Sequence, residues 1–172
     1  QKVFSPKNTA QHFSDDHEYI MVYAANKDRW RPNHIPRTSE QDSVTGIAVD
    51  ASGVYVVGQT LGGLPGFVSG GGTDVFVSKL TASGNYAWAK AFGSGIDDIG
   101  YGIAVAQDGR VYTTGTFQNS PDFDPGTGIY QLTSAGGTDV FVSVLDATGA
   151  YVRAERYGGT SADTGTGIAA AG

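Results

Sequence analysis

The residues best suited to chemistry form a short cluster near the start of the sequence. The segment HFSDDH carries two imidazoles and two carboxylates, which belong to His12, Asp15, Asp16 and His17. Imidazole and carboxylate groups together suit a divalent metal such as zinc or manganese. The His-x4-His spacing is not a standard zinc spacing, and the two rings share a face only if the stretch is helical or tightly turned. The alternative interpretation is a helix N-terminus, with Ser14 as the N-cap and acids in the first turn.

A second pair of carboxylates lies in the segment DFDPGTG. Asp122 and Asp124 alternate just before a Pro-Gly turn, and carboxylate oxygens are ligands that calcium prefers. Calcium takes roughly six to eight oxygens, and the loop lacks the Asp-x-Asp-x-Asp-Gly spacing of a calcium-binding loop. Two interpretations are therefore open, a cation site in this loop or a turn whose acids cap backbone NH groups.

A third set of acids recurs in fixed sequence contexts. One Asp precedes each Gly-Ile-Ala motif by four residues and another ends each Gly-Gly-Thr-Asp motif; they are Asp42, Asp98, Asp163, Asp74 and Asp139. Because these acids recur, we interpret them as structural: an Asp before a strand can accept hydrogen bonds from backbone NH groups and fix the turn. No Gly-x-Ser-x-Gly nucleophile motif occurs. All histidines precede residue 42, so any imidazole ligand or base must come from that part.

The elements that must position these acids belong to an internal repeat. The octapeptide GGTDVFVS occurs at residues 71–78 and again at residues 136–143, and four strand-like segments recur around it in the same order. Apolar residues alternate along these segments, and turn dipeptides ending in glycine separate them. The copies differ in length mainly through an insertion at residues 118–135. Four antiparallel strands in a repeat of this length are typical of one blade of a β-propeller.

Composition divides the chain into two unlike parts. Residues 1–42 contain all three histidines and no glycine, whereas residues 43–172 contain all 26 glycines and carry the whole net charge of −6. Cysteine is absent, which excludes disulfides and thiolate metal sites. No apolar run is long enough to cross a membrane, and no secretion signal is recognisable, so we expect a soluble chain without a membrane partner. The negative charge argues against nucleic acid as the main partner.

These observations predict an all-β fold with four parts. We expect an N-terminal segment over residues 1–42, one propeller blade over residues 43–97 and a second over residues 98–162. Residues 163–172 repeat the start of a blade, and we expect them to form the first strand of a third one.

The repeated motifs resemble a known bacterial family. The order DSVTGIAVD, GVYVVGQT, GGTDVFVSKL and ASGNYAWAK resembles the β-propeller repeats often called SBBP repeats, over about 130 residues. The segment DFDPGTG also resembles the inter-strand loop of many such repeats. The resemblance implies propeller blades on large, often exported or surface proteins, and it implies no catalytic residue set.

The N-terminal part resembles a different family. The string SDDHEYIMVYAANK followed by WRPNHIPRTSEQD resembles an internal fragment of restriction–modification DNA adenine methyltransferases. The Asp-Pro-Pro-Tyr motif of such enzymes is absent, and a segment without glycine cannot form the loop that holds the methyl donor. Methyl transfer is therefore excluded, and the chain resembles a chimera of a methyltransferase fragment and propeller blades.

Two blades are too few for a closed ring, because propellers contain roughly four to eight. We therefore expect a homo-oligomer of three or four chains, in which the last strand of one chain pairs with a blade of the next as a swapped element. The predicted function is a self-assembling scaffold or binding module, with a small molecule as a further partner. The alternative is a metal-dependent hydrolase of phosphotriesters or esters, in which His12, His17 and Asp15 or Asp16 hold the metal and a bound water attacks.

Overall fold

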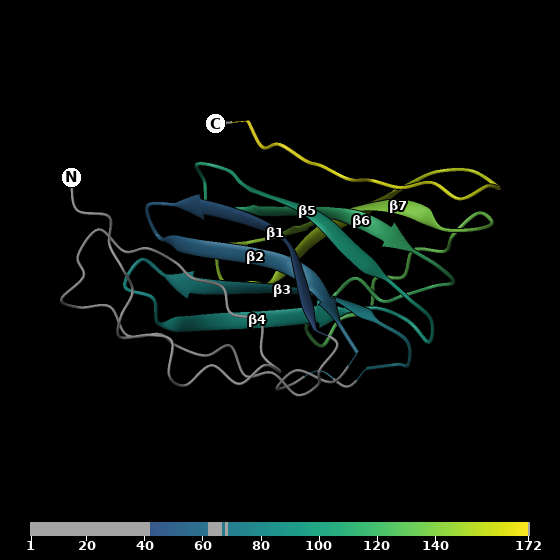
Figure 1. The fold of residues 1–172 in the computed structure, drawn as a ribbon, viewed down its shortest axis with the longest axis horizontal. Helices are drawn as coiled ribbons and strands as arrows, with labels where there is room; N and C mark the ends of the chain where they lie inside the picture. The colour runs from purple at the N-terminus through teal and green to yellow at the C-terminus, as the bar shows by residue number, and fades with distance from the viewer. Residues whose placement is uncertain (1–41, 62–66, 68, 172) are drawn as a thin grey trace, which may run out of the picture.

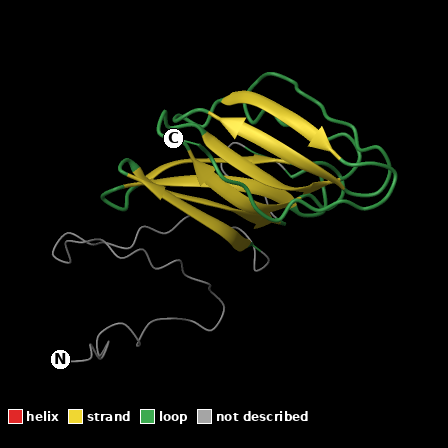
Figure 2. Ribbon diagram, turned by 90° about the horizontal axis from the view of Figure 1, so that it is seen from above, coloured by secondary structure: helices red, strands yellow, loops and turns green. Residues whose placement is uncertain are grey.

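The computed structural model describes residues 42–61, 67 and 69–171. Within these residues every regular element is a β-strand, and the strands form two four-stranded antiparallel sheets (Figures 1 and 2). The described residues accordingly include no helix that could span a membrane. The predicted all-β class, with four antiparallel strands in each repeat, is confirmed.

Each repeat folds into one sheet. Sheet A contains β1 (Ser43–Asp50), β2 (Gly53–Thr60), β3 (Asp74–Thr81) and β4 (Tyr86–Phe92). Sheet B contains β5 (Ile99–Val105), β6 (Val111–Phe117), β7 (Asp139–Leu145) and β8 (Tyr151–Tyr157). Strands that follow one another in sequence are neighbours in both sheets, as expected when short turns connect antiparallel strands.

The two sheets share the same register. In sheet A, Phe76 of β3 lies opposite Gly58 of β2, and in sheet B, Phe141 of β7 lies opposite Gly115 of β6. Each sheet also has an irregularity in its first strand and another near the end of its third strand. The recurring octapeptide therefore occupies equivalent positions in two equivalent sheets.

The main hydrophobic core lies between the two sheets. β5 lies against β1 and β2 of sheet A, and the hydroxyl of Thr45 donates a hydrogen bond to the carbonyl of Gly100 across this contact. Both sheets contribute alternate residues to the core, as strands with one buried face must. The fully buried aromatic and branched core residues include Tyr55, Val57, Val75, Val77, Phe92, Val111, Phe117, Phe141 and Leu145.

The insertion in the second repeat adds one residue to this core. The ring of Phe123 is completely buried. Its centroid lies 5.0 Å from that of Phe92 and 5.4 Å from those of both Phe117 and Phe141. The extra loop is therefore anchored between the sheets by an aromatic cluster.

Residues 163–171 lie on the face of sheet B that points away from sheet A. A Cβ atom built on Gly165 would be 2.5 Å from Val140 Cγ1, just as one built on Gly100 of β5 would be 3.0 Å from Val75 Cγ1. The segment thus lies on sheet B as β5 lies on sheet A (Figure 1). It forms no strand, since a strand needs a hydrogen-bonded neighbour and the described residues offer it none.

Candidate functional site

The recurring aspartates meet where one repeat joins the next. The NH of Asp98 donates to the carbonyl of Thr73 at 2.7 Å, and the NH of Asp163 donates to that of Thr138, also at 2.7 Å. Both acceptors belong to Gly-Gly-Thr-Asp motifs, and both donors precede the Gly-Ile-Ala motif that follows. The duplicated octapeptide therefore has a joining role, in addition to forming the third strand of each sheet.

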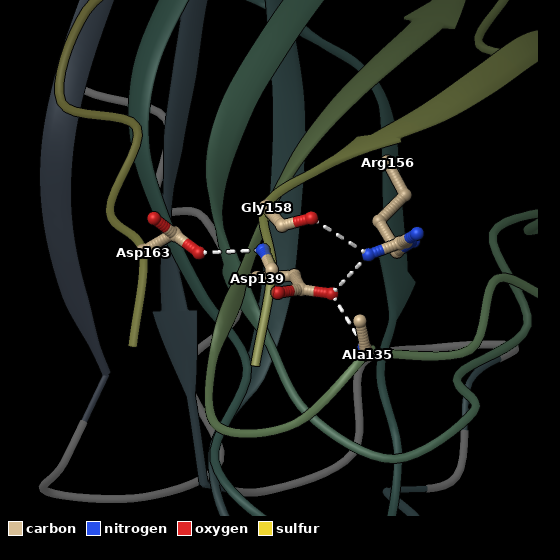
Figure 3. A network of polar contacts seen from close by, with 6 residues as sticks. Ala135, Asp139, Arg156, Gly158 and Asp163 are labelled. Carbon is tan, nitrogen blue, oxygen red and sulfur yellow. Dashed lines mark hydrogen bonds and ion pairs between the residues drawn. The ribbon is translucent and has the colours of Figure 1, made fainter. Parts of the chain in front are cut away.

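In the second copy of this junction a buried carboxylate has an arginine partner (Figure 3). Asp139 is fully buried at the start of β7. Its Oδ2 accepts hydrogen bonds from Nη1 of Arg156 and from the NH of Ala135, both at 2.7 Å. The same guanidinium nitrogen donates to the carbonyl of Gly158 at 3.1 Å. Arg156 is positioned because β8 pairs with β7, which places it opposite Phe141.

These contacts decide the charge of Asp139. Burial by itself raises the pKa of a carboxyl group, because it removes water from the charged form. The NH of Ala135 and the guanidinium of Arg156 outweigh burial, so the pKa of Asp139 lies below its ordinary value. Asp139 is therefore a stable, charged member of a partly exposed ion pair.

A glycine lies beside the carboxylate in each copy. A Cβ on Gly158 would be 2.5 Å from Oδ1 of Asp139 and 2.8 Å from Oδ2 of Asp163, and its φ of 141° also favours glycine. A Cβ on Gly93, at the equivalent position of the first copy, would be 1.9 Å from Oδ1 of Asp74. In both copies the carboxylate occupies the space that a side chain would need.

In the first copy the equivalent carboxylate has no charged partner among the described residues. Asp74 is fully buried, and no donor in that part of the chain meets hydrogen-bond geometry with either of its oxygens, although the hydroxyl of Ser69 lies near enough to lower its pKa. Ala91 lies opposite Phe76, at the position that Arg156 has in the second copy. The prediction that the recurring acids bond backbone NH groups is thus wrong for Asp74. Its repeat reaches β3 through the shorter connection, and the described residues of that connection make no bond equivalent to that from the Ala135 NH.

Burial is the main cause that raises the pKa of Asp74, and the hydroxyl of Ser69 offsets it only in part. The neighbouring Asp98 is also buried. Its Oδ2 accepts from the NH of Ser94 at 2.6 Å and its Oδ1 from the NH of Gln118 at 3.0 Å. Burial nevertheless raises the pKa of Asp98 to about 6, and the charge of Asp74 adds to this effect.

Asp74 and Asp98 therefore form a buried pair of acids at the first junction. The ion pairs found in the described part of the chain are Arg110–Asp108, Arg153–Glu155 and Arg156–Asp139. None of them involves either member of this buried pair. Among the described residues, backbone NH groups donate to Asp98 and none donates to Asp74.

The acids of the DFDPGTG loop hold backbone NH groups. Asp122 Oδ1 accepts from the NH of Asp124 at 3.0 Å and from that of Tyr130 at 2.8 Å. Asp124 Oδ1 accepts from the NH of Gly126 at 2.8 Å. These bonds fix the loop on both sides of the buried Phe123. The cation site predicted at Asp122 and Asp124 stays a prediction.

The predicted metal cluster of His12, Asp15, Asp16 and His17 lies outside the described residues, so the metal site and the hydrolase built on it also stay predictions. Among residues 42–61, 67 and 69–171, no group of three or more His, Cys, Asp or Glu side chains could hold a metal ion. Any metal at the described acids would therefore need other oxygen ligands as well.

The outer faces of the two sheets differ in how they are covered. Ile47 of β1 is 56% exposed, whereas Ile103, its equivalent on β5, is 8% exposed because it packs against sheet A. On the opposite outer face, Tyr157 of β8 is 53% exposed, whereas its equivalent Phe92 is 2% exposed. Val49 of β1 is exposed as well. On the same face of sheet A, Val54, Val56, Phe76 and Ala91 are buried, so the exposed apolar residues Ile47 and Val49 lie at the β1 edge of that face.

The interpretation of the sequence missed Arg156 as the partner of Asp139. The signal was present in the alignment of the two repeats, where YAWAKAFG and YVRAERYG place Ala91 and Arg156 at the same position. A change from alanine to arginine beside an acid that recurs in both repeats would have indicated that its charge is compensated differently in the two copies.

Comparison with known proteins adds no assignment. No protein-family model matches the sequence, and no curated protein matches it.

Proposed function

We propose that the chain is a pair of β-propeller blades that assembles with further copies of itself into a ring and serves as a scaffold or binding module. The observation that carries this proposal is the exposure of Ile47 on sheet A, set against the burial of Ile103 on sheet B. The two residues occupy the same position in the repeat, so the β1 edge of sheet A, beside the buried Val56 and Phe76, is built like the edge of sheet B that packs against sheet A.

The order of stacking along the chain supports the same proposal. β5 lies on sheet A, and residues 163–171 lie in the equivalent place on sheet B. Stacking in one direction leaves exposed apolar residues at each end, Ile47 and Val49 on sheet A and Tyr157 on sheet B, and a head-to-tail contact between copies would cover both ends. Because propellers contain roughly four to eight blades, three or four chains would give a closed ring.

The covering partner we propose is therefore a second copy of the chain. Its sheet B end, with residues 163–171, would cover Ile47 and Val49 of its neighbour. Burial of such a side chain stabilises an interface by about 1.5–3 kcal/mol. A free edge strand beside an exposed apolar face also favours association over a monomer.

Light scattering after size-exclusion chromatography tests the proposal. We expect a mass three or four times the chain mass of 17.8 kDa. The double variant Ile47→Asp, Val49→Asp should shift the mass to that of one chain, and the control Val152→Asp, an exposed residue of β8, should leave it unchanged. A wild-type mass of one chain at micromolar concentration would contradict the proposal.

A further inference from the structure

Within the described residues, the first junction holds two buried carboxyl groups without a counter-charge. Asp74 is fully buried, and in that part of the chain neither of its oxygens has a donor in hydrogen-bond geometry, while the neighbouring Asp98 is buried and accepts from the backbone NH groups of Ser94 and Gln118. Two buried negative charges are strongly destabilising unless a positive charge or protons compensate them. No Lys or Arg within the described residues makes an ion pair with either acid.

The second junction shows where a positive charge sits in this architecture. There the guanidinium of Arg156 lies 2.7 Å from Oδ2 of Asp139, on the same face of the sheet as Phe141. In the first copy the equivalent side chain is the methyl group of Ala91, and the acid it would meet is Asp74. Each repeat therefore has a position for a positive charge next to the Asp of its Gly-Gly-Thr-Asp motif. Only the second repeat has a basic residue, Arg156, at that position.

We propose that Asp74 and Asp98 bind a divalent cation that takes oxygen ligands, with Ca²⁺ as the best representative, and that Arg156 replaces this cation in the second copy. Two carboxylates match a charge of two. Each carboxylate oxygen has two lone pairs, so the bonds from Ser94 and Gln118 to Asp98 leave acceptor sites free. Calcium takes roughly six to eight oxygens, so water or backbone carbonyls must supply the remaining ligands.

The charges at the two junctions agree with this assignment. The described residues place the guanidinium of Arg156 on Asp139, whereas they place no cationic group on Asp74 or Asp98. A cation between Asp74 and Asp98 would favour their charged forms as Arg156 favours that of Asp139. The competing explanation is that the first pair simply keeps a proton.

Calcium titration of the full chain distinguishes the cation from the proton. The protein is dialysed against EGTA and then against chelator-free buffer at pH 7.5, and CaCl₂ or MgCl₂ is added. Calorimetry should give one Ca²⁺ per chain. The Tm followed by circular dichroism should rise by roughly 5–10 °C at about one hundred times the Kd. Absence of both binding heat and a Tm rise with either cation would overturn the proposal and favour the retained proton.

Matched variants locate the site. Asp74→Asn and Ala91→Arg should each abolish the Ca²⁺-dependent rise in Tm, the first by removing a ligand and the second by supplying an internal cation. If the arginine introduced by Ala91→Arg prevents folding, Asp74→Asn still tests the site, because it removes a buried charge and is expected to fold. Asp122→Asn and His17→Ala should keep the response. Calcium binding that survives Asp74→Asn would overturn the proposal.

The reciprocal variant tests the second half of the proposal. Arg156→Ala removes the cationic partner from Asp139 and Asp163, the equivalents of Asp74 and Asp98. Asp139 keeps its bond from the Ala135 NH and Asp163 is half-buried, and the variant should raise the stoichiometry to two Ca²⁺ per chain. An unchanged stoichiometry of one would overturn the claim that Arg156 stands in the place of a cation.

Discussion

Sheets A and B carry the same Gly-Gly-Thr-Asp motif before their third strands, but the two motif aspartates have opposite electrostatic surroundings. Asp139 has Arg156 and a backbone NH, and its pKa is lowered. Asp74 has neither, and burial raises its pKa. One substitution between repeats, Ala91 against Arg156, accounts for the missing guanidinium. Identity of a motif therefore does not ensure identity of its charge state.

The faces of the two sheets differ in a second way. Sheet B is covered by sheet A on one side, and residues 163–171 lie on the other. Sheet A is covered by sheet B on one side. On its other side Phe76 and Val56 are buried, but Ile47 and Val49 of β1 stay exposed. Equivalent positions thus contribute to folding in one sheet and are available for association in the other.

The largest expected effect distinguishes these equivalent isoleucines. Ile103→Ala should lower the free energy of unfolding by about 2–5 kcal/mol, because it leaves a cavity in the core between the sheets. Ile47→Ala should change the stability of the dissociated chain by less than about 1 kcal/mol, since the side chain is exposed. Urea unfolding followed by circular dichroism measures the free energy of unfolding of both variants. Equal decreases would show that Ile47 and Ile103 are buried to the same extent.

The second prediction uses the pH dependence of the first junction. The folded-state pKa of Asp98, about 6, lies above its value in the unfolded chain. The folded state therefore binds more protons between about pH 4 and 6, and stability should fall as pH rises through this window. In calcium-free buffer the loss is on the order of 3 kcal/mol, because one pKa unit corresponds to about 1.4 kcal/mol.

Asp98→Asn is the control for this pH dependence, since it should remove the fall between about pH 4 and 6. The carboxyl groups of Asp139 and Asp146 have lowered pKa values, so they contribute stability that is lost only as pH falls below about 4. Wild-type stability that stays level or rises from about pH 4 to 6 would contradict the expected charge state of Asp98.

The third prediction concerns a variant that gives the second junction the alanine found at the equivalent position of the first. Arg156→Ala should cost about 2–3 kcal/mol in calcium-free buffer, less than for a fully buried pair because the arginine is partly exposed. Arg153→Ala removes an exposed arginine paired with Glu155 and should cost no more than about 1 kcal/mol. If the two variants unfold at the same urea concentration, the Asp139–Arg156 pair does not stabilise the junction.

The smallest effect concerns the glycine beside the carboxylates. Gly158→Ala should cost about 1–3 kcal/mol, because the residue has a φ of 141° and its Cβ would meet Asp139 and Asp163. Gly159→Ala is the matched control, since a Cβ there has no neighbour within 4 Å, and it should stay within about 1 kcal/mol of wild type. Thermal unfolding of both variants at one pH measures the difference; a control as unstable as Gly158→Ala would rule out the contact as the cause.

Much of the fold could be predicted from local patterns. Alternation of apolar residues and glycine-containing turns act over a few residues, so they indicated the strands and their antiparallel order without any tertiary information. Recurrence of GGTDVFVS indicated that Phe76 and Phe141 occupy equivalent buried positions. The turn role expected for Asp98 and Asp163 holds, because each accepts a hydrogen bond from a backbone NH four residues before it.

The sequence by itself thus determined the class of the fold, the strands of each repeat and the positions of the acids. Only the tertiary structure decided that Arg156 reaches Asp139, that no described Lys or Arg pairs with Asp74 and that Phe123 fills the core between the sheets. The physical reason is distance along the chain. Charge compensation and packing depend on which side chains different strands and loops bring together, and no pattern within a single segment records that pairing.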